Sequence, residues 1–465
     1  MRKFSQWLLL ASSLGLLAGC GGSGSGTGGG TQPATQFALR GPASSGAGFA
    51  FTFTVTARDA ANNVASGYSG TVHFTSSDPA AGLPHDSMLV NGTQTFTATL
   101  TNAGFQTITA TDTVSTSLRG SFSVTTVAGE FPVASFGAKG DGQTDDTAAI
   151  QRAINAASAA GGGSVVLSVA RYFTAGRLVV PQGVVLSGAV EGPFDFQALS
   201  QTGIASASTL LITNTSGPFL TLQGVGAGVT DLVFHYPKQV ATSASIPNVY
   251  PYTILVTAPG TKVARSTANN AYNFLDIESG RVLAQDLFIG AFHNDINIDH
   301  ASDHVTLRHL VHSVFWDIVG GQQYPQPIDT WVLNNGTALV VGRMDSLEVS
   351  DFFVFSRFTG MLLTDSSDTS QNPTCGYGTG SDFDIEGVQY GIVVTASNAP
   401  GYKFTNLFIE SQLDMGQAAV QVRTGGSLPP KIEINGVQQG GYAPWADGAF
   451  PPPPVGELLV VNMLP

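Results

Sequence analysis

The stretch FGAKGDGQTDDTAAIQRAI, residues Phe136–Ile154, joins an acidic, glycine-rich loop to an amphipathic run. Apolar residues recur in that run at positions i, i+3 and i+4, which predicts a helix with one buried face. Thr144 is placed to cap the amino end of the helix, and Asp145 and Asp146 then fall in its first turn, facing the positive end of the helix dipole. Gly161–Gly163 are expected to end it. The acidic loop is therefore predicted to be scaffolding rather than a catalytic or calcium site.

Beyond this helix the chain is a long series of short strands. An apolar residue recurs at the same place in each pattern, at Leu287, Leu310, Phe352, Val388, Leu407 and Val437. The steps of 23, 42, 36, 19 and 30 residues fit coils of about 20 to 23 residues, some doubled and some carrying loop insertions. Such repeats are typical of a parallel β-helix, in which each coil stacks its apolar residues on the coil below. The alternative, a large antiparallel β-sandwich, would not preserve this order of elements.

The amino terminus reads as an export signal. Arg2 and Lys3 precede an apolar run, Trp7–Leu17, that is too short to span a membrane. Leu17–Cys20 resembles the lipobox of bacterial lipoproteins, which implies that residues 1–20 are a signal peptide and that Cys20 is acylated. Gly21 is not the aspartate that retains many such proteins at the inner membrane, so the resemblance implies an outer-membrane lipoprotein or a cell-surface location.

Two segments separate this signal from the predicted β-helix. Residues 21–36 are rich in Gly and Ser and predict a flexible linker. Residues 37–127 alternate Thr with apolar residues between short turns, which predicts a small antiparallel β-sandwich. This segment resembles the bacterial immunoglobulin-like repeats of surface and carbohydrate-active proteins. The resemblance implies a spacer, with sugar or partner binding as the open alternative.

The composition limits the choice of partners. Only 11% of residues are charged and the net charge is −13, which argues against nucleic acid, whose phosphates need Lys and Arg. An acidic polysaccharide would need a cation or a local cluster of arginines to bind this chain. Once Cys20 carries lipid, Cys375 is the only thiol left, so no intramolecular disulfide is expected.

Several motifs together resemble a known family. They are Phe136–Gly142, the helix start at Thr144–Thr147, Gly161–Leu167 and Gly176–Ala189. In combination they resemble the amino-terminal signature of the pectate lyase superfamily, which includes polygalacturonase-like and rhamnogalacturonase-like proteins. The resemblance implies a right-handed parallel β-helix over residues 131–465 with the opening helix as its cap, and carbohydrate as the class of ligand.

Further along, the chain resembles the catalytic motifs of polygalacturonases only in part. His293–Asp299 and Trp316–Asp317 resemble the first two motifs of those enzymes, but Trp316 stands where an aspartate is expected. The later His-Gly and Arg-Ile-Lys motifs do not occur. The polygalacturonase mechanism therefore cannot be carried over residue by residue.

Two polar clusters are the candidate sites. The first comprises the predicted catalytic residues Asp295, Asp299, Asp317, His293 and His312, with Trp316, Tyr324 and Arg308 as predicted substrate-binding residues. On a strand, Asp295 and Asp299 are expected to face outward while Ile296 and Ile298 fill the core. The alternative face comprises Asp382, Asp384 and Glu386. The histidines lack the spacing of zinc ligands, so no metal site is predicted.

The sequence thus predicts an all-β, surface-anchored lipoprotein that binds, and as an enzyme cleaves, a pectin-like or other acidic polysaccharide. A hydrolase would use a carboxylic acid and a carboxylate. A lyase would need a base, with Arg281, Arg308, Arg343 and Arg357 as the candidates, and Ca²⁺ held by carboxylates. No other cofactor is expected, and the membrane is contacted through the lipid alone. The alternative is a non-catalytic glycan-binding or adhesin-like protein; the sugar and the oligomeric state stay open.

Overall fold

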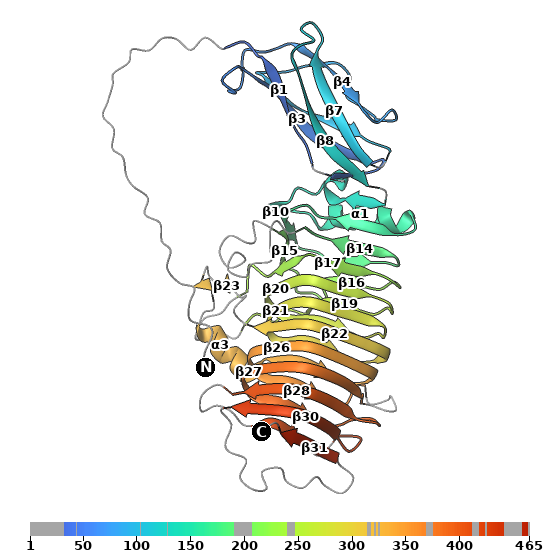
Figure 1. The fold of residues 1–465 in the computed structure, drawn as a ribbon, viewed down its shortest axis with the longest axis vertical. Coiled ribbons are helices and arrows are strands. Elements are labelled where there is room, and N and C mark those ends of the chain that lie inside the picture. The colour runs from blue at the N-terminus through green and yellow to red at the C-terminus, as the bar shows by residue number, and fades with distance from the viewer. Residues whose placement is uncertain are drawn as a thin grey trace, which may run out of the picture.

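The computed structural model describes residues 32–463, apart from 43, 103, 128, 190–206, 240–246, 314–317, 320–321, 324–325, 369–374, 412–417, 424–425 and 441–457. Figure 1 shows a small β-sandwich above a long stack of coils. In the part of the chain that is described, no helix has both the length and the apolar character needed to cross a membrane.

The β-sandwich covers the segment that the sequence predicts to be one. One sheet has the order β1 (Gln36–Arg40), β3 (Ala50–Arg58), β6 (Thr93–Thr99). The other has the order β2 (Ser44–Gly46), β8 (Arg119–Val127), β7 (Gly104–Asp112), β4 (Thr71–Ser76), β5 (Ser87–Met88). Apolar residues of the alternating strands, such as Phe53 and Val55, point into a shared core, while the threonines between them face outward.

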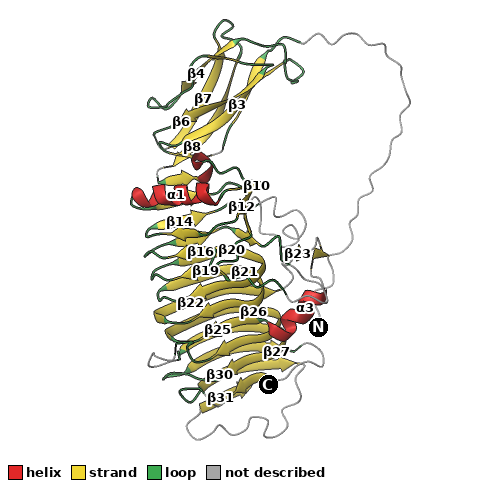
Figure 2. Ribbon diagram, turned by 180° about the vertical axis from the view of Figure 1, so that it is seen from behind, coloured by secondary structure: helices red, strands yellow, loops and turns green. Residues whose placement is uncertain are grey.

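The sandwich rests directly on the end of the β-helix. The Phe49 ring lies 5.0 Å from that of Phe131 and 5.5 Å from that of Phe136. The Ser135 hydroxyl donates a hydrogen bond to the carbonyl of Ala50, at 2.7 Å. Three aromatic rings and a hydrogen bond therefore join the two parts, which lie end to end in Figure 2.

The acidic loop caps the β-helix and its carboxylates are structural. It leads through β9 (Glu130–Pro132), a 3₁₀ turn (Val133–Phe136) and β10 (Asp141–Asp145) into α1 (Thr147–Ala159), which ends before the predicted glycines. Asp146, 1% exposed, accepts hydrogen bonds from the backbone N–H groups of Lys139 and Gly140. The prediction that Thr144 caps α1 is wrong, because Asp146 is the N-cap residue and the Thr144 hydroxyl instead bonds Asp141.

The rest of the chain winds into a right-handed parallel β-helix. The first coils contain β11 (Gly163–Val166), β12 (Ala170–Thr174), β13 (Leu178–Val180), β14 (Val184–Ser187), β15 (Ser208–Ile212), β16 (Leu220–Leu222), β17 (Gly228–Thr230), β18 (Val233–His235) and β19 (Tyr252–Val256). The later coils contain β20 (Lys262–Ile277), β21 (Val282–Ile298), β22 (Ala301–Ser313), β25 (Thr337–Val341), β26 (Met344–Leu363), β27 (Gly378–Val394), β28 (Tyr402–Glu410), β29 (Ala418–Val422), β30 (Lys431–Gly440) and β31 (Leu458–Met463).

The parallel pairings divide each coil among three faces. Sheet A stacks the segments around residues 283, 306, 348 and 379; sheet B those around 288, 311, 353 and 384; sheet C those around 255, 276, 297, 340, 362, 393 and 421. Apolar residues from all three sheets fill one continuous core. The β-helix predicted from the repeats is therefore present.

One residue of the predicted repeat is assigned to the wrong position. Phe352 pairs with Phe383, and Phe383 with Leu407, so Phe383 holds the repeat position that the sequence pattern gives to Val388. Val388 is an inward residue on the next face and pairs with Arg357. The correct steps there are 31 and 24 residues, closer to one coil plus an insertion than 36 and 19 are.

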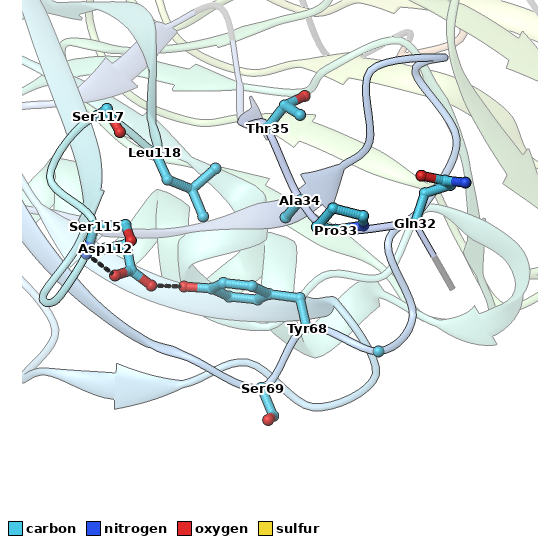
Figure 3. A pocket seen from close by; sticks show the side chains of 11 residues that line it. Gln32, Pro33, Ala34, Thr35, Tyr68, Ser69, Asp112, Ser115, Ser117 and Leu118 are labelled. Carbon is cyan, nitrogen blue, oxygen red and sulfur yellow. Dashed lines mark hydrogen bonds between the residues drawn. The ribbon is translucent and has the colours of Figure 1, made fainter. Parts of the chain in front are cut away.

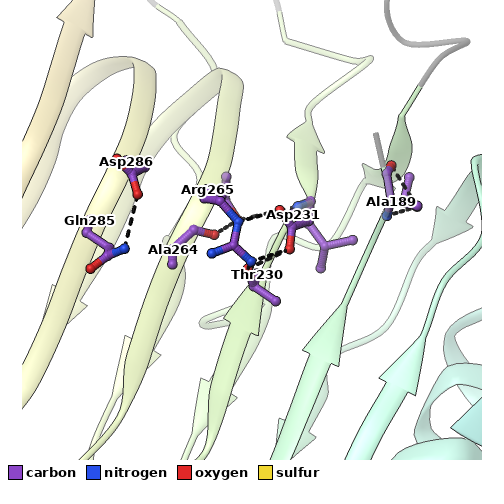
Figure 4. A network of polar contacts seen from close by, with 10 residues as sticks. Ala189, Thr230, Asp231, Ala264, Arg265, Gln285 and Asp286 are labelled. Atoms are coloured by element: carbon purple, nitrogen blue, oxygen red, sulfur yellow. Dashed lines mark hydrogen bonds and ion pairs between the residues drawn. The ribbon is translucent and has the colours of Figure 1, made fainter. Parts of the chain in front are cut away.

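Sheets A and B meet at a one-residue corner in the left-handed conformation. The φ angles are positive at Asp231, Arg265, Asp286, His309, Asp351, Asp382 and Asn406. Asp and Asn tolerate this conformation best among residues with a side chain, which explains most of this ladder. Arg265 is less suited, and it is held by two hydrogen bonds of 2.7 Å to the Asp231 carboxylate (Figure 4).

A long insertion interrupts the coil between β22 and β25. It contains β23 (Ile318–Val319), β24 (Gln322–Gln323) and α3 (Gln326–Asn335). The helix α3 packs against β26 and β21 at the edge between sheets B and C. Its end is fixed by Gln389, whose side-chain amide donates to the Leu333 carbonyl at 2.8 Å. The insertion therefore lies beside sheet C and extends its edge.

Candidate functional site

Two of the predicted catalytic residues lie inside the β-helix. His312 pairs with Ile289 and Val354, both of which point into the core, and both His312 and Asp295 are fully buried. The prediction that Asp295 faces outward is wrong. The pairing of β20 with β21 shifts register just before this point, so the in-and-out alternation restarts at the corner and turns Asp295 inward.

These two residues form a buried ionic cluster with Arg357. The Asp295 carboxylate accepts from His312 Nδ1 at 2.8 Å and from Arg357 Nη2 at 2.9 Å. Burial lowers the pKa of His312 although the Asp295 charge works in the opposite direction, which favours the neutral imidazole. Because all three side chains are fully buried, no substrate reaches them in this structure.

Asp299 is also built into the scaffold. Its carboxylate accepts hydrogen bonds from the backbone N–H groups of His300, Arg343 and Ser367, at 2.8 to 3.0 Å. Burial alone would raise its pKa, but these bonds, led by that of Ser367, lower it. Asp299 therefore ties together the turns of successive coils.

The remaining residues of the first cluster do not gather around it. Arg308 lies on the outer face of sheet A, 3.3 Å from Glu348. Trp316, Asp317, Tyr324 and Cys20 lie outside the described residues. Of the arginines considered as lyase bases, Arg281 is paired with Asp303, Arg343 follows β25 in a turn, and Arg357 is buried.

The alternative face on sheet B holds a group of close carboxyls. Asp384 and Glu386 share a hydrogen bond, and Glu410 lies on the next coil. Burial raises the pKa of both Asp384 and Glu386, and the neighbouring negative charges add to the effect. Two carboxyls joined by a hydrogen bond lie closer than the spacing of about 5 Å or more that glycosidases use. Asp382 sits apart at the corner, bonded to Ser381 and Asn406.

The outer face of sheet C presents a different pair of carboxyls. Asp276 points outward, since Leu275 and Ile277 on either side are fully buried, and the exposed Glu278 is the first residue after β20. Burial raises the pKa of Asp276 to about 6, and the charges of Glu278 and Asp299 contribute. The two carboxyls are not joined by a hydrogen bond, and residues so placed on a strand lie roughly 6.5–7 Å apart.

Hydroxyl and amide groups surround Asp276. The Asn297 amide donates to the Asp276 carboxylate at 2.8 Å, and the Asn294 amide donates to the Tyr252 hydroxyl at 3.2 Å. Burial raises the pKa of Tyr252, with the Asp276 charge as the next contribution, so this hydroxyl keeps its proton. The Asp276 surroundings thus contain both donors and acceptors for sugar hydroxyls.

An aromatic wall stands beside these polar groups. The His293 ring stacks on that of Tyr272 with centroids 5.1 Å apart and planes 8° apart. Trp331, carried by α3, lies 5.9 Å from the Tyr272 ring and 6.5 Å from His293. Burial lowers the pKa of His293, which favours its neutral form. We call Asp276, Glu278, Tyr252, and this wall of Tyr272, His293 and Trp331 the sheet C site.

Two features of the sequence point to this site. Asp276-Ile277-Glu278 repeats the acidic pattern of the Asp384–Glu386 face. AYNFLDI and FHNDINI also align one coil apart, which places Tyr272 over His293. Of the predicted catalytic residues that the structure describes, His293 is the one that belongs to the sheet C site.

A hollow lies in the β-sandwich. It has a volume of about 600 Å³ and is lined by Tyr68, Asp112, Ser115 and the entering chain at Gln32–Thr35 (Figure 3). The Asp112 carboxylate there accepts from the Tyr68 hydroxyl and from two backbone N–H groups. Its acid group is thus engaged in holding the turn after β7. Within the described ranges, no group of three or more His, Cys, Asp or Glu side chains is arranged to hold a metal ion.

Comparison with known proteins agrees with the motifs. Residues 131–311 match the family model described as rhamnogalacturonase A/epimerase, pectate lyase-like. Over these residues the chain is similar to that family. The matched segment includes every residue of the sheet C site except Trp331, and the resemblance seen in the sequence is confirmed there.

Individual relatives match over shorter or more distant stretches. Alginate lyase 7 of Azotobacter vinelandii is 47% identical over 70 residues, which are 14% of this chain and 8% of that relative. The mannuronan C5-epimerase AlgE4 of the same organism is 46% identical over 70 residues, 14% of this chain and 13% of that relative. An exopolygalacturonase structure from Thermotoga maritima aligns over 68% of this chain and 82% of its own, with 12% identity and a TM-score of 0.40. The chain thus matches only a small part of the length of the two sequence relatives.

Proposed function

We propose that this protein hydrolyses an acidic polysaccharide at the sheet C site, with Asp276 as general acid and Glu278 as general base. The observation that carries the proposal is the carboxyl pair itself. One member has its pKa raised to about 6 by burial, and the other is the exposed residue that directly follows β20. A buried carboxyl with a raised pKa, close to an exposed carboxylate, is an arrangement that suits an acid and a base in one site.

The spacing favours hydrolysis with inversion. Inverting glycosidases hold their carboxyls about 6.5–9.5 Å apart, which leaves room for a water molecule, and alternate residues of an extended chain have backbone positions roughly 6.5–7 Å apart. Asp276 would give its proton to the glycosidic oxygen as the bond from carbon to that oxygen breaks. Glu278 would take a proton from the water that attacks the same carbon from the opposite side. Tyr272, His293 and Trp331 would support the sugar rings beside the reacting bond.

The test is a panel of purified polysaccharides, including alginate and polygalacturonate, with two readouts on each. Hydrolysis releases reducing ends without ultraviolet absorbance, and NMR of the first product shows the inverted anomer. Asp276→Asn and Glu278→Gln are each expected to lower turnover by about a hundredfold or more. Glu348→Gln on sheet A and Glu386→Gln on sheet B are the matched controls and keep wild-type turnover.

A second reaction is favoured by one observation, the closeness of Tyr252 to Asp276. In β-elimination, ionised Asp276 would take the proton next to a uronate carboxyl, a carbon–carbon double bond would form, and Tyr252 would protonate the leaving oxygen. Absorbance from unsaturated uronates, lost in Tyr252→Phe, would replace the hydrolytic proposal with this one. If neither product forms while the polysaccharide binds, the protein is a glycan-binding protein.

We also propose that the protein acts at the cell envelope. The support is the Leu17–Cys20 lipobox pattern, which would place a lipid at Cys20, and the Gly- and Ser-rich linker that follows it. The linker would hold the β-sandwich and the β-helix away from the membrane.

A further inference from the structure

A cation stacked on an aromatic ring lies on sheet C, several coils from Asp276. The guanidinium carbon of Arg423 is 5.1 Å from the centre of the Tyr390 ring. Arg423 Nε donates to the Gln421 side-chain oxygen at 2.6 Å, and the Phe358 ring packs edge-on against Tyr390 at 5.3 Å. The exposed guanidinium is therefore held by two neighbours, Tyr390 and Gln421, and Phe358 supports the Tyr390 ring.

The stacked pair of Tyr390 and Arg423 lies on the same face as the sheet C site. Tyr390 pairs with Thr359, which pairs with Thr337, which in turn pairs with Asn294, so Tyr390 and Asn294 occupy equivalent positions of their coils. Four coil steps separate the strand of Asp276 from that of Tyr390, or about 19 Å at about 4.8 Å per coil.

The helix α3 connects the two places along one edge. Trp331 on this helix contacts Tyr272 at the sheet C site, and the Leu333 carbonyl accepts from Gln389, the residue before Tyr390. The coils between present half-buried Val340 and Leu362 on the outer face. The outer face between the carboxyl pair and the cation is thus lined by Val340 and Leu362 together with the polar Thr337.

The positive charge of Arg423 at this position is unusual in an acidic chain. The chain carries a net charge of −13, and ion pairs with carboxylates are formed by Arg265, Arg281, Arg308 and Arg357. Among the described side chains, no Asp or Glu forms an ion pair with Arg423. A guanidinium that is planar, exposed and stacked on a ring presents its remaining N–H groups for a carboxylate.

We propose that Tyr390 and Arg423 form a remote subsite for a uronate residue. The Arg423 guanidinium would bind the uronate carboxylate, while the aromatic surface of Tyr390 and Phe358 would contact the sugar. This inference deepens the proposed function, on which it rests, because it makes the substrate a polyuronate chain that runs parallel to the β-helix axis. It also supplies the local positive charge that an acidic chain needs in order to bind an acidic polymer.

The test is binding of oligosaccharides of different length and charge, measured by calorimetry at low salt. The probes are an oligogalacturonate disaccharide, the octasaccharide, and a carboxyl-reduced octasaccharide, with the matching oligomannuronates as a second set. Arg423→Gln is expected to weaken octasaccharide binding by about tenfold or more, equal to about 1.4 kcal/mol, since a bond to a charged group is lost. Binding of the disaccharide and of the reduced octasaccharide should change less than about twofold.

The controls separate this inference from the proposed function. Lys403→Gln, which removes a cation paired with Glu433 on sheet A, should leave every affinity unchanged. Equal loss of affinity for the charged and the reduced octasaccharide in Arg423→Gln would overturn the subsite, as would no loss for either. If wild-type protein cleaves a polyuronate and Asp276→Asn does not, while Arg423→Gln binds normally, the subsite is wrong and the proposed function stands. If no uronate oligomer binds at all, the subsite is wrong as well.

Discussion

Replacing Asp295 with Asn should destabilise the fold without changing the turnover of the folded protein. Asp295 and Arg357 are both fully buried, with 2.9 Å between the carboxylate and the guanidinium. Asn keeps the size of the side chain but leaves the Arg357 charge without a counter-charge. Breaking a buried ion pair by removing one partner costs about 3–5 kcal/mol, because the remaining charge stays desolvated.

The assay is urea-induced unfolding followed by circular dichroism, together with turnover per folded molecule. Asp295→Asn should lower the free energy of unfolding by about 3–5 kcal/mol and keep its turnover. The triple variant Asp295→Leu, His312→Leu and Arg357→Met should recover most of that loss, because His312 stacks between Ile289 and Val354 in an apolar column.

Two results would refute this reasoning. Wild-type stability in Asp295→Asn would mean that the ion pair is not buried as the structure shows it. A loss of turnover of about a hundredfold at unchanged stability would mean that Asp295 is catalytic after all, as the sequence pattern predicts.

Three further predictions concern the envelope, the cap and pH. Cys20→Ser should release the protein from membranes and prevent labelling with a radioactive fatty acid; a wild-type protein that carries no lipid would contradict this. Asp146→Ala should lower the free energy of unfolding by about 1–3 kcal/mol, because the Lys139 and Gly140 amides lose their acceptor. Asp86→Ala, at an exposed position, is the control. Equal stability of the two variants would show that the loop does not depend on the Asp146 carboxylate. Burial lowers the pKa of His235 to about 4, below its ordinary value of about 6.5. As the pH falls from 6.5 to 4, His235 is therefore protonated in the unfolded chain but not in the folded one. The free energy of unfolding should fall by up to about 3 kcal/mol over this range. His235→Leu should reduce that slope in urea titrations at several pH values, and an unchanged slope would argue against a buried neutral histidine.

The sequence by itself was sufficient for the fold class, since local patterns carry it. The i, i+3, i+4 run from Ala149 to Ala157 has one way to bury its apolar face, and α1 does so. The stacked apolar residues at Leu287, Leu310 and Phe352 fall in register because each coil must cover the one before it. The threonine alternation of residues 37–127 likewise predicts strands with one buried face, and β3 and β6 have that pattern.

The tertiary structure alone decided which polar residues reach the surface. Alternation along a strand holds only while the strand is straight, and the corner before Asn294 turned Asp295 into the core while leaving Asn297 outside. The insertion that carries α3 placed Trp331 beside Tyr272 and His293, which no spacing along the chain could predict. Asp276 and Asp384 occupy the same Asp-Ile-Glu pattern, yet the Asp276 carboxyl is hydrogen-bonded to Asn297 and the Asp384 carboxyl to Glu386, because the neighbouring coils differ. Strand periodicity is a local property and set the fold, whereas the separation and the pKa of two carboxyls depend on residues from several coils at once.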